Sequence, residues 1–298
     1  MTTAPASGAP SRTRQRRALW IALAANGAFL LVEVAGGIVF NSIALLADAA
    51  HMLSDVAALA IALVAHALIT RPGSPRHTYG YQRAEVLAAQ LNGLLLLGVS
   101  AWIAVEAIER FNSPRAVSGA GLTAVAAAGL VVNVTSAIVV ARARGNSVNM
   151  KGAFVHLAAD SASSGVAVIA GLAIAFSGKT WFDPAASLAI TAGVIWAAVE
   201  LLREASGILL EAAPRGMSVE EVETALASQT GVESVHHLHL WNLASDVPAL
   251  SAHVVIDGDP SLHEAQVKGD ELRHMLEAQF GIAHATLELE CHECEDQP

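Results

Sequence analysis

Residues 42–55 read Ser-Ile-Ala-Leu-Leu-Ala-Asp-Ala-Ala-His-Met-Leu-Ser-Asp, and the apolar run that contains them continues to Ile69. Asp48, His51 and Asp55 are spaced at i, i+3 and i+7, so an α-helix places them on one face. A run of about 20 apolar residues is long enough to cross a bilayer. Ionisable groups at that depth are costly and mark function, so this stretch predicts a membrane helix with a functional face.

A second apolar stretch, over about residues 152–176, repeats the His-x-x-x-Asp spacing at His156 and Asp160. A lone histidine in a membrane helix is more often a packing residue, but a matched pair in two helices favours metal ligation. Two facing helices would supply two nitrogens and two oxygens, from His51, Asp55, His156 and Asp160. This donor set suits tetrahedral Zn²⁺. Co²⁺, Ni²⁺, Cd²⁺ and Fe²⁺ accept similar ligands and stay open as cargo.

The composition is that of a polytopic membrane protein. The chain has 298 residues, of which 54% are hydrophobic and 15% charged, with a mean hydropathy of +0.49. Residues 1–210 hold 14 Lys and Arg against 10 Asp and Glu, whereas residues 211–298 hold 3 against 17. The acidic C-terminal part argues against a nucleic-acid partner and is compatible with cation handling.

Hydropathy predicts a disordered basic N-terminus over residues 1–17 and a transport domain over residues 18–210. Six membrane spans are expected within that domain, at about 18–40, 43–69, 84–108, 119–141, 152–176 and 184–202.

The loop cations predict the orientation of these spans. Twelve cations fall on the side of the N-terminus, namely Arg12, Arg14, Arg16, Arg17, Arg71, Arg76, Arg83, Arg142, Arg144, Lys151, Arg203 and Arg215. Three fall in the opposite loops, namely Arg110, Arg115 and Lys179. We therefore expect a multi-pass protein of the inner (plasma) membrane with both termini in the cytoplasm.

Other polar residues lie within the predicted spans. Asn26 and Glu33 are seven residues apart on one face of the first span, and Asp48 precedes His51 by one turn. They either line the ion path or form hydrogen bonds that hold the helices together. Asp48 is the strongest candidate for a group that supports the metal ligands or lines the path.

Residues 211–290 predict a small α+β domain. Ser218 and Glu221 have capping-box spacing at the start of a helix. Strands over 232–243 and 248–257, a helix over 261–279 and a strand over 284–290 complete the order αββαβ, which is typical of a ferredoxin-like fold. Because a domain of about 80 residues has a small core, we expect pairing with a second copy.

Histidines gather in this domain, at His236, His237, His239 and His253. Strand alternation predicts His237 and His239 on one face and His236 on the other. Residues 291–298 form a Cys/His tail in which Cys291, His292 and Cys294 favour metal chelation over a disulfide.

The chain resembles the cation diffusion facilitators, and its zinc-exporting bacterial branch in particular, from residue 18 to 290. The resemblance rests on the 42–55 stretch and on His77-Thr-Tyr-Gly-Tyr-Gln-Arg-Ala-Glu85, Asn149-Met-Lys-Gly-Ala-Phe-Val-His-Leu-Ala-Ala-Asp160 and Val235-His-His-Leu-His-Leu-Trp-Asn242. It implies a homodimer with a cytoplasmic ferredoxin-like domain and a transport site at His51, Asp55, His156 and Asp160. It also favours His236, His253 and Glu290, with Glu288 as a further candidate, as ligands of a second zinc with a structural or regulatory role; ordinary surface histidines are the alternative.

The sequence therefore predicts a secondary transporter that exports zinc from the cytoplasm in exchange for protons, without an organic cofactor. No Walker motif is present, so ATP is not the expected energy source. An intramembrane metalloenzyme is the less favoured alternative because the chain lacks His-Glu-x-x-His. A membrane-tethered metal sensor is less favoured because an anchor would not need matched ligand pairs.

Arg83 and Glu211 are expected at the same membrane face, at the start of the third span and after the sixth. We hypothesise that they pair and hold the helices in register with the C-terminal domain, where low water access would strengthen the ion pair. Two independently solvated charges are the alternative.

Overall fold

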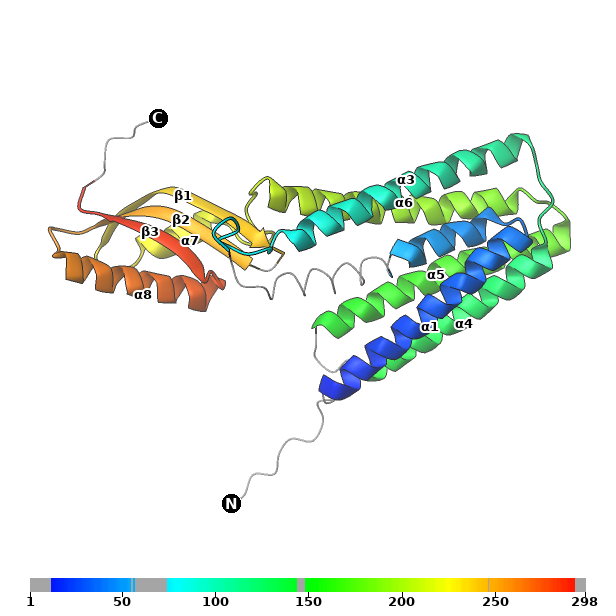
Figure 1. Cartoon of the computed structure of the whole chain (residues 1–298), viewed down its shortest axis with the longest axis horizontal. Coiled ribbons are helices and arrows are strands. Elements are labelled where there is room, and N and C mark those ends of the chain that lie inside the picture. Colours follow the sequence, from blue (N-terminus) through cyan, green and yellow to red (C-terminus); the bar gives the residue numbers. More distant parts are fainter. Residues whose placement is uncertain (1–11, 55, 57–73, 144–147, 246, 293–298) are drawn as a thin grey trace, which may run out of the picture. The chain divides into compact units, whose positions relative to one another are not determined.

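The computed structural model describes residues 12–54, 56, 74–143, 148–245 and 247–292 (Figure 1). The chain divides into two compact units. One comprises the membrane helices up to residue 60 and between residues 92 and 200, and the other comprises the ends of α3 and α6 with the C-terminal domain.

The described residues contain five helices long and apolar enough to cross a membrane, together with a shorter apolar helix, Ile43–Ser54. The long helices are α1 (Arg12–Val39), α3 (Ala84–Asn112), α4 (Gly119–Ala143), α5 (Val148–Ser177) and α6 (Phe182–Leu209). Each of the five contains most or all of a predicted span. The remaining span, predicted over 43–69, is described only in its first part, and residues 57–69 lie outside the described residues.

The first unit is built on close approach of its helices. In this unit α4 packs against both α1 and α5 (Figure 1). Gly171 of α5 lies so close to α4 that a Cβ there would stand 2.7 Å from the backbone nitrogen of Thr123. Small residues at such crossings let membrane helices approach, which strengthens packing where lipid provides no hydrophobic driving force.

A buried polar network fixes the start of the Ile43–Ser54 helix. Asp183 of α6 is fully buried and accepts hydrogen bonds from the Ser42 hydroxyl (2.5 Å) and from the N–H groups of Ile43 (3.0 Å) and Ala44 (3.3 Å). The Nη1 atom of Arg110 lies 3.7 Å from Asp183 Oδ2. A carboxylate at a helix N-terminus satisfies orphan N–H groups and suits the helix dipole.

The assignment of Arg110 to a loop is therefore wrong. Arg110 lies within α3, and its side chain is buried. The guanidinium group donates to the carbonyl of Asn41 (2.5 Å), to Asn41 Oδ1 (3.1 Å) and to Glu106 (3.0 Å). Hydropathy placed the end of the helix at residue 108 because it scores an arginine as exposed, whereas partners on other segments satisfy this one.

The C-terminal domain has the predicted order αββαβ. Its elements are α7 (Val219–Ala227), β1 (Val232–Ala244), β2 (Val247–Ile256), α8 (Leu262–Phe280) and β3 (His284–Glu290). The strands lie in the order β1-β2-β3, with β1 antiparallel and β3 parallel to β2.

Both helices of this domain cover one face of the sheet (Figure 1). Leu226 of α7 and Leu272 and Leu276 of α8 are fully buried against Ala252 and Val254 of β2. Since side chains alternate along a strand, His253 points to the opposite face, which neither α7 nor α8 covers and which we call the uncovered face.

The helix caps differ from the prediction. Ser218 accepts from the backbone N–H of Glu221 (3.2 Å), but its hydroxyl donates to Glu220, so only half of the predicted capping box is observed among the described residues. The complete box lies at α8, between Ser261 and Glu264. Hydrogen bonds from the hydroxyl and the N–H of Ser261 lower the pKa of the Glu264 carboxyl.

Candidate metal sites

His51 and Asp160 meet within the first unit. The Nε2 atom of His51, on the Ile43–Ser54 helix, lies 3.1 Å from Oδ1 of Asp160, on α5. Asp160 is buried and His51 half-buried. The structure thus brings together one nitrogen and one oxygen from the two helices that carry the His-x-x-x-Asp pairs.

The other two predicted ligands are described less fully. His156 lies on α5, one turn before Asp160, and its side chain lies outside the described part of the structure. Asp55 lies outside the described residues.

A network of buried polar groups surrounds Asp48. Its Oδ1 lies 2.5 Å from the Ser163 hydroxyl and its Oδ2 lies 3.2 Å from that of Ser164, both on α5. Asn133 of α4 donates to Ser164 in turn (3.2 Å). Asp48 therefore links three helices one turn from His51. The sequence reading missed the two serines, although hydroxyls following Asp160 in an apolar span were a usable signal.

Asn26 and Glu33, the two polar residues predicted on one face of α1, differ in their hydrogen bonding. Asn26 donates to the carbonyl of Ala22 on its own helix (3.0 Å), so this bond links it to no other helix. Glu33 is fully buried, lies close enough to Asp48 to interact with it, and has no hydrogen-bond partner for either carboxyl oxygen among the described residues.

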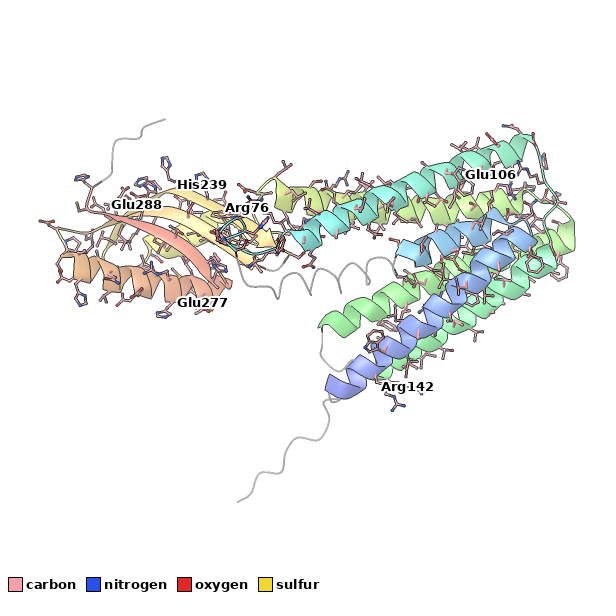
Figure 2. All side chains as sticks on the ribbon, viewed as in Figure 1. Arg76, Glu106, Arg142, His239, Glu277 and Glu288 are labelled. Atoms are coloured by element: carbon pink, nitrogen blue, oxygen red, sulfur yellow. The ribbon has the colours of Figure 1, made fainter. Side chains whose placement is uncertain are left out.

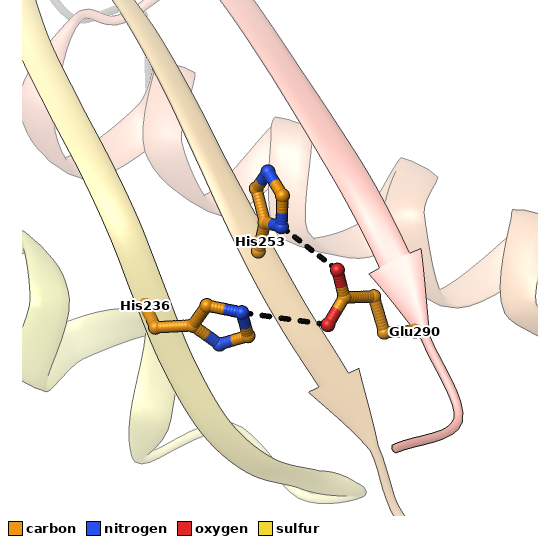
Figure 3. A group of neighbouring side chains, drawn as sticks. All are labelled: His236, His253 and Glu290. Carbon is orange, nitrogen blue, oxygen red and sulfur yellow. Dashed lines mark hydrogen bonds and ion pairs between the residues drawn. The ribbon is translucent and has the colours of Figure 1, made fainter. Parts of the chain in front are cut away.

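In the C-terminal domain, His236, His253 and Glu290 form a cluster on the uncovered face of the sheet (Figure 3). Nδ1 of His253 lies 2.7 Å from Glu290 Oε1, and Nε2 of His236 lies 3.4 Å from Glu290 Oε2. One potential ligand atom from each of the three residues lies within 4.8 Å of the others. Two imidazoles and a carboxylate are a donor set that zinc accepts.

The predicted alternation of the histidines is wrong. His236 pairs with His253 and His239 pairs with Ser251, so three residues of β1 advance against two of β2. His237 has a φ of 48°, and its ring lies 5.2 Å from that of His253. A β-bulge inserts one residue and reverses the facing of those that follow, so His239 shares the face of His236.

The remaining C-terminal candidates lie around this cluster. Glu288 of β3 (Figure 2) has its Oε2 3.5 Å from Nε2 of His253. Cys291 and His292 follow β3 and are exposed, and Cys291 is a free thiol. Cys294 lies outside the described residues.

Arg83 and Glu211 meet within the second unit. Nη2 of Arg83 lies 2.9 Å from Oε1 of Glu211. Their side chains are 38% and 62% exposed within the single chain. The low water access expected from the sequence is therefore not observed there, and an exposed pair of this kind is worth about 0–1 kcal/mol.

These features define a multi-pass membrane protein with a partly buried His–Asp contact among its helices and a small α+β domain that carries a cluster of two histidines and a glutamate. The chain belongs to the cation efflux family. The model of the cation efflux transmembrane domain matches residues 19–210, and that of the cation efflux protein cytoplasmic domain matches residues 214–292. The resemblance to cation diffusion facilitators is confirmed, and the chain is a transporter for divalent metal efflux rather than an enzyme.

Several relatives align over most of both chains. The metal cation efflux system protein CzcD of Cupriavidus metallidurans is 41% identical over 94% of this chain and 88% of its own length. The zinc transporter ZitB of Escherichia coli is 37% identical, covering 96% and 90%. The cadmium, cobalt and zinc/H(+)-K(+) antiporter of Bacillus subtilis is 35% identical, covering 88% and 85%.

Among solved structures, the metal-bound C-terminal domain of the CzcD transporter from the same Cupriavidus species is 35% identical. It covers 25% of this chain and 99% of that chain, with a TM-score of 0.23.

Proposed function

We propose that this transporter exports Zn²⁺ from the cytoplasm in exchange for protons and that His51, Asp55, His156 and Asp160 bind the ion. The contact between His51 and Asp160 is the observation that carries the proposal, because it joins the two helices that hold the matched pairs. The relatives named as a zinc transporter and as a cadmium, cobalt and zinc/H(+)-K(+) antiporter support zinc as cargo and protons as the counter-ion.

Metal and hydrogen compete at this contact. In the structure the two ligand atoms, His51 Nε2 and Asp160 Oδ1, are hydrogen-bonded to each other. A metal ion bound by both atoms requires the hydrogen to leave Nε2, since only an unprotonated nitrogen binds a metal. Acidification favours the protonated imidazole and release of the ion, because the free pKa of histidine is about 6.5.

The C-terminal domain supplies a second, regulatory zinc site in this proposal. His236, His253 and Glu290 are the ligands, with Glu288 positioned beside them. Cys291, His292 and Cys294 would extend it from the tail. Binding there would tie β1, β2 and β3 together across the uncovered face of the sheet, with no organic cofactor involved.

The proposed assembly is a homodimer in the inner membrane with both termini in the cytoplasm. We keep the domain boundaries that the sequence predicts, 1–17, 18–210, 211–290 and 291–298, with one correction: α1 begins at Arg12, so residues 12–17 are helical rather than disordered. The match of residues 214–292 to the family's cytoplasmic domain supports the placement of the C-terminus. The Arg83–Glu211 pair would keep α3 and α6 in register with that domain.

Transport into proteoliposomes with an imposed pH gradient tests the function. We expect the wild-type chain to move Zn²⁺ into the vesicles and to alkalinise the lumen in step, because protons leave as zinc enters, and a panel of Co²⁺, Ni²⁺, Cd²⁺ and Fe²⁺ measures its preference. Asp160→Ala should abolish transport while the protein still inserts, because the remaining ligands hold the ion weakly. Glu109→Ala, which changes an exposed carboxylate of α3, is the matched control. Transport by Asp160→Ala at the wild-type rate would refute the assignment.

A further inference from the structure

Glu33 of α1 and Asp48 of the Ile43–Ser54 helix form a pair of acids inside the helix bundle. Their residues are 0% and 2% exposed, and they lie close enough for each carboxyl group to act on the other. Neither oxygen of Glu33 has a hydrogen-bond donor among the described residues. Two ionised carboxylates only accept hydrogen bonds, so neither acid can satisfy the other unless one of them carries a proton.

The number of hydrogens available to the acceptors around Asp48 also indicates a bound proton. The Ser163 hydroxyl lies 2.5 Å from Asp48 Oδ1 and 2.9 Å from the carbonyl oxygen of Asp160, yet it has one hydrogen to donate. Ser164 accepts from Asn133 and gives its own hydrogen to Asp48 Oδ2. With both acids ionised, the network has more acceptors than hydrogens. One added proton on either acid supplies a missing hydrogen-bond donor.

The surroundings offer no positive counter-charge among the described groups. The charged or titratable groups that act on the pair are Asp160 of α5 and His51, which shares a helix with Asp48. The neighbouring α4 contributes Asn133 and the space beside Gly129, and holds no titratable residue before Arg142. Two buried like charges without a partner are strongly unfavourable, so one of the two acids stays neutral.

We propose that Glu33 and Asp48 together form a proton-binding site distinct from the metal ligands. The pair holds one proton while the transport site is free of metal and releases it when a divalent cation binds at His51 and Asp160. One proton leaves to water as one cation arrives, and it returns when the cation departs. The cation's charge, one helical turn from Asp48 and on Asp160, stabilises the ionised pair. This inference rests on the proposed exchange of metal for protons.

Proton release on zinc binding tests the pair in the full-length chain. The chain in detergent is titrated with ZnCl₂ in weakly buffered solution, and the protons released per zinc are counted. Glu33→Gln keeps a hydrogen-bond donor toward Asp48 but cannot titrate. We expect it to release about one proton fewer per zinc, with the slope of log affinity against pH lower by about one. Zinc bound by the C-terminal domain contributes equally to both chains and cancels in the difference.

Two variants serve as controls. Glu33→Asp retains a titratable group and should restore release toward the wild-type count. Asn26→Ala alters another polar side chain of α1, one that bonds within its own helix and does not titrate, and should release the wild-type number. An unchanged count in Glu33→Gln with intact zinc binding overturns the proposal.

If Glu33→Gln does not fold, infrared difference spectra of the wild-type chain test whether a protonated carboxyl group is present without metal. Zinc should remove the C=O stretch of a protonated carboxyl group, and the absence of that band from the metal-free chain at neutral pH overturns the proposal. The inference and the proposed function fail separately. A chain that carries zinc in vesicles but shows no Glu33-dependent proton release refutes only the pair. A chain that shows this release but carries no zinc refutes only the transport function.

Discussion

Replacement of Asp183 should destabilise the membrane helices far more than its position near a helix end suggests. Its carboxylate is fully buried, accepts three hydrogen bonds around Ser42 and lies 3.7 Å from the buried Arg110. Breaking a buried ion pair by removing one partner costs about 3–5 kcal/mol. Within that, loss of the hydrogen bonds that Asp183 accepts from Ile43 and Ala44 is comparable to loss of a helix N-cap, about 0.5–2 kcal/mol. We therefore expect Asp183→Leu to lose about 3–5 kcal/mol of unfolding free energy.

A graded series of variants separates charge from shape. Asp183→Asn keeps one acceptor oxygen and the volume but removes the charge, so a smaller loss of about 1–3 kcal/mol is expected. Arg115→Gln is the control, because Arg115 is 55% exposed and pairs with Glu106 at the surface, where such pairs contribute about 0–1 kcal/mol. Unfolding of the purified chain in mixed micelles by increasing SDS, followed by tryptophan fluorescence, measures the order.

The reasoning is refuted if Asp183→Leu is no less stable than Arg115→Gln. The double variant Arg110→Leu with Asp183→Leu gives a second check. Since it leaves no buried charge from this pair without its partner, its loss should be smaller than the sum of the two single losses. Strict additivity would mean that the two side chains do not interact.

Three further predictions follow from the geometry. His253→Ala should remove most of the rise in melting temperature that zinc causes in the full chain, because His253 contacts Glu290 at the proposed C-terminal site; an equal rise in variant and wild type argues against that site. Charge reversal at Arg83 or Glu211 should slow zinc transport, and the swap of both should recover part of the rate, whereas a double variant no faster than the slower single one would end the pairing hypothesis. Gly171→Val should unfold at lower SDS than Gly165→Val, since a Cβ at Gly171 collides with α4 but one at Gly165 meets nothing within 4 Å; equal midpoints would contradict the packing argument.

The amino-acid sequence by itself determined the class of fold and the candidate transport ligands. Long apolar runs can satisfy their backbone in a membrane only as helices, so local composition suffices to find them. In the C-terminal domain the order αββαβ followed from periodicity, which is also local. The spacing of His51 and Asp55, repeated at His156 and Asp160, identified the candidate ligands because helical geometry puts residues four apart on one face.

Only the tertiary structure decided which polar groups meet. It placed Arg110 against Asp183, although these residues lie far apart in the sequence and neither has a local signal of pairing. It buried Glu33 near Asp48 and left both Glu33 carboxyl oxygens without a hydrogen-bond partner among the described residues. It also put His239 on the face of His236 through a bulge that strict alternation does not anticipate. Burial makes each of these arrangements consequential, because a polar group inside a protein must find its partner there, and the partner is supplied by whichever segment the fold brings alongside.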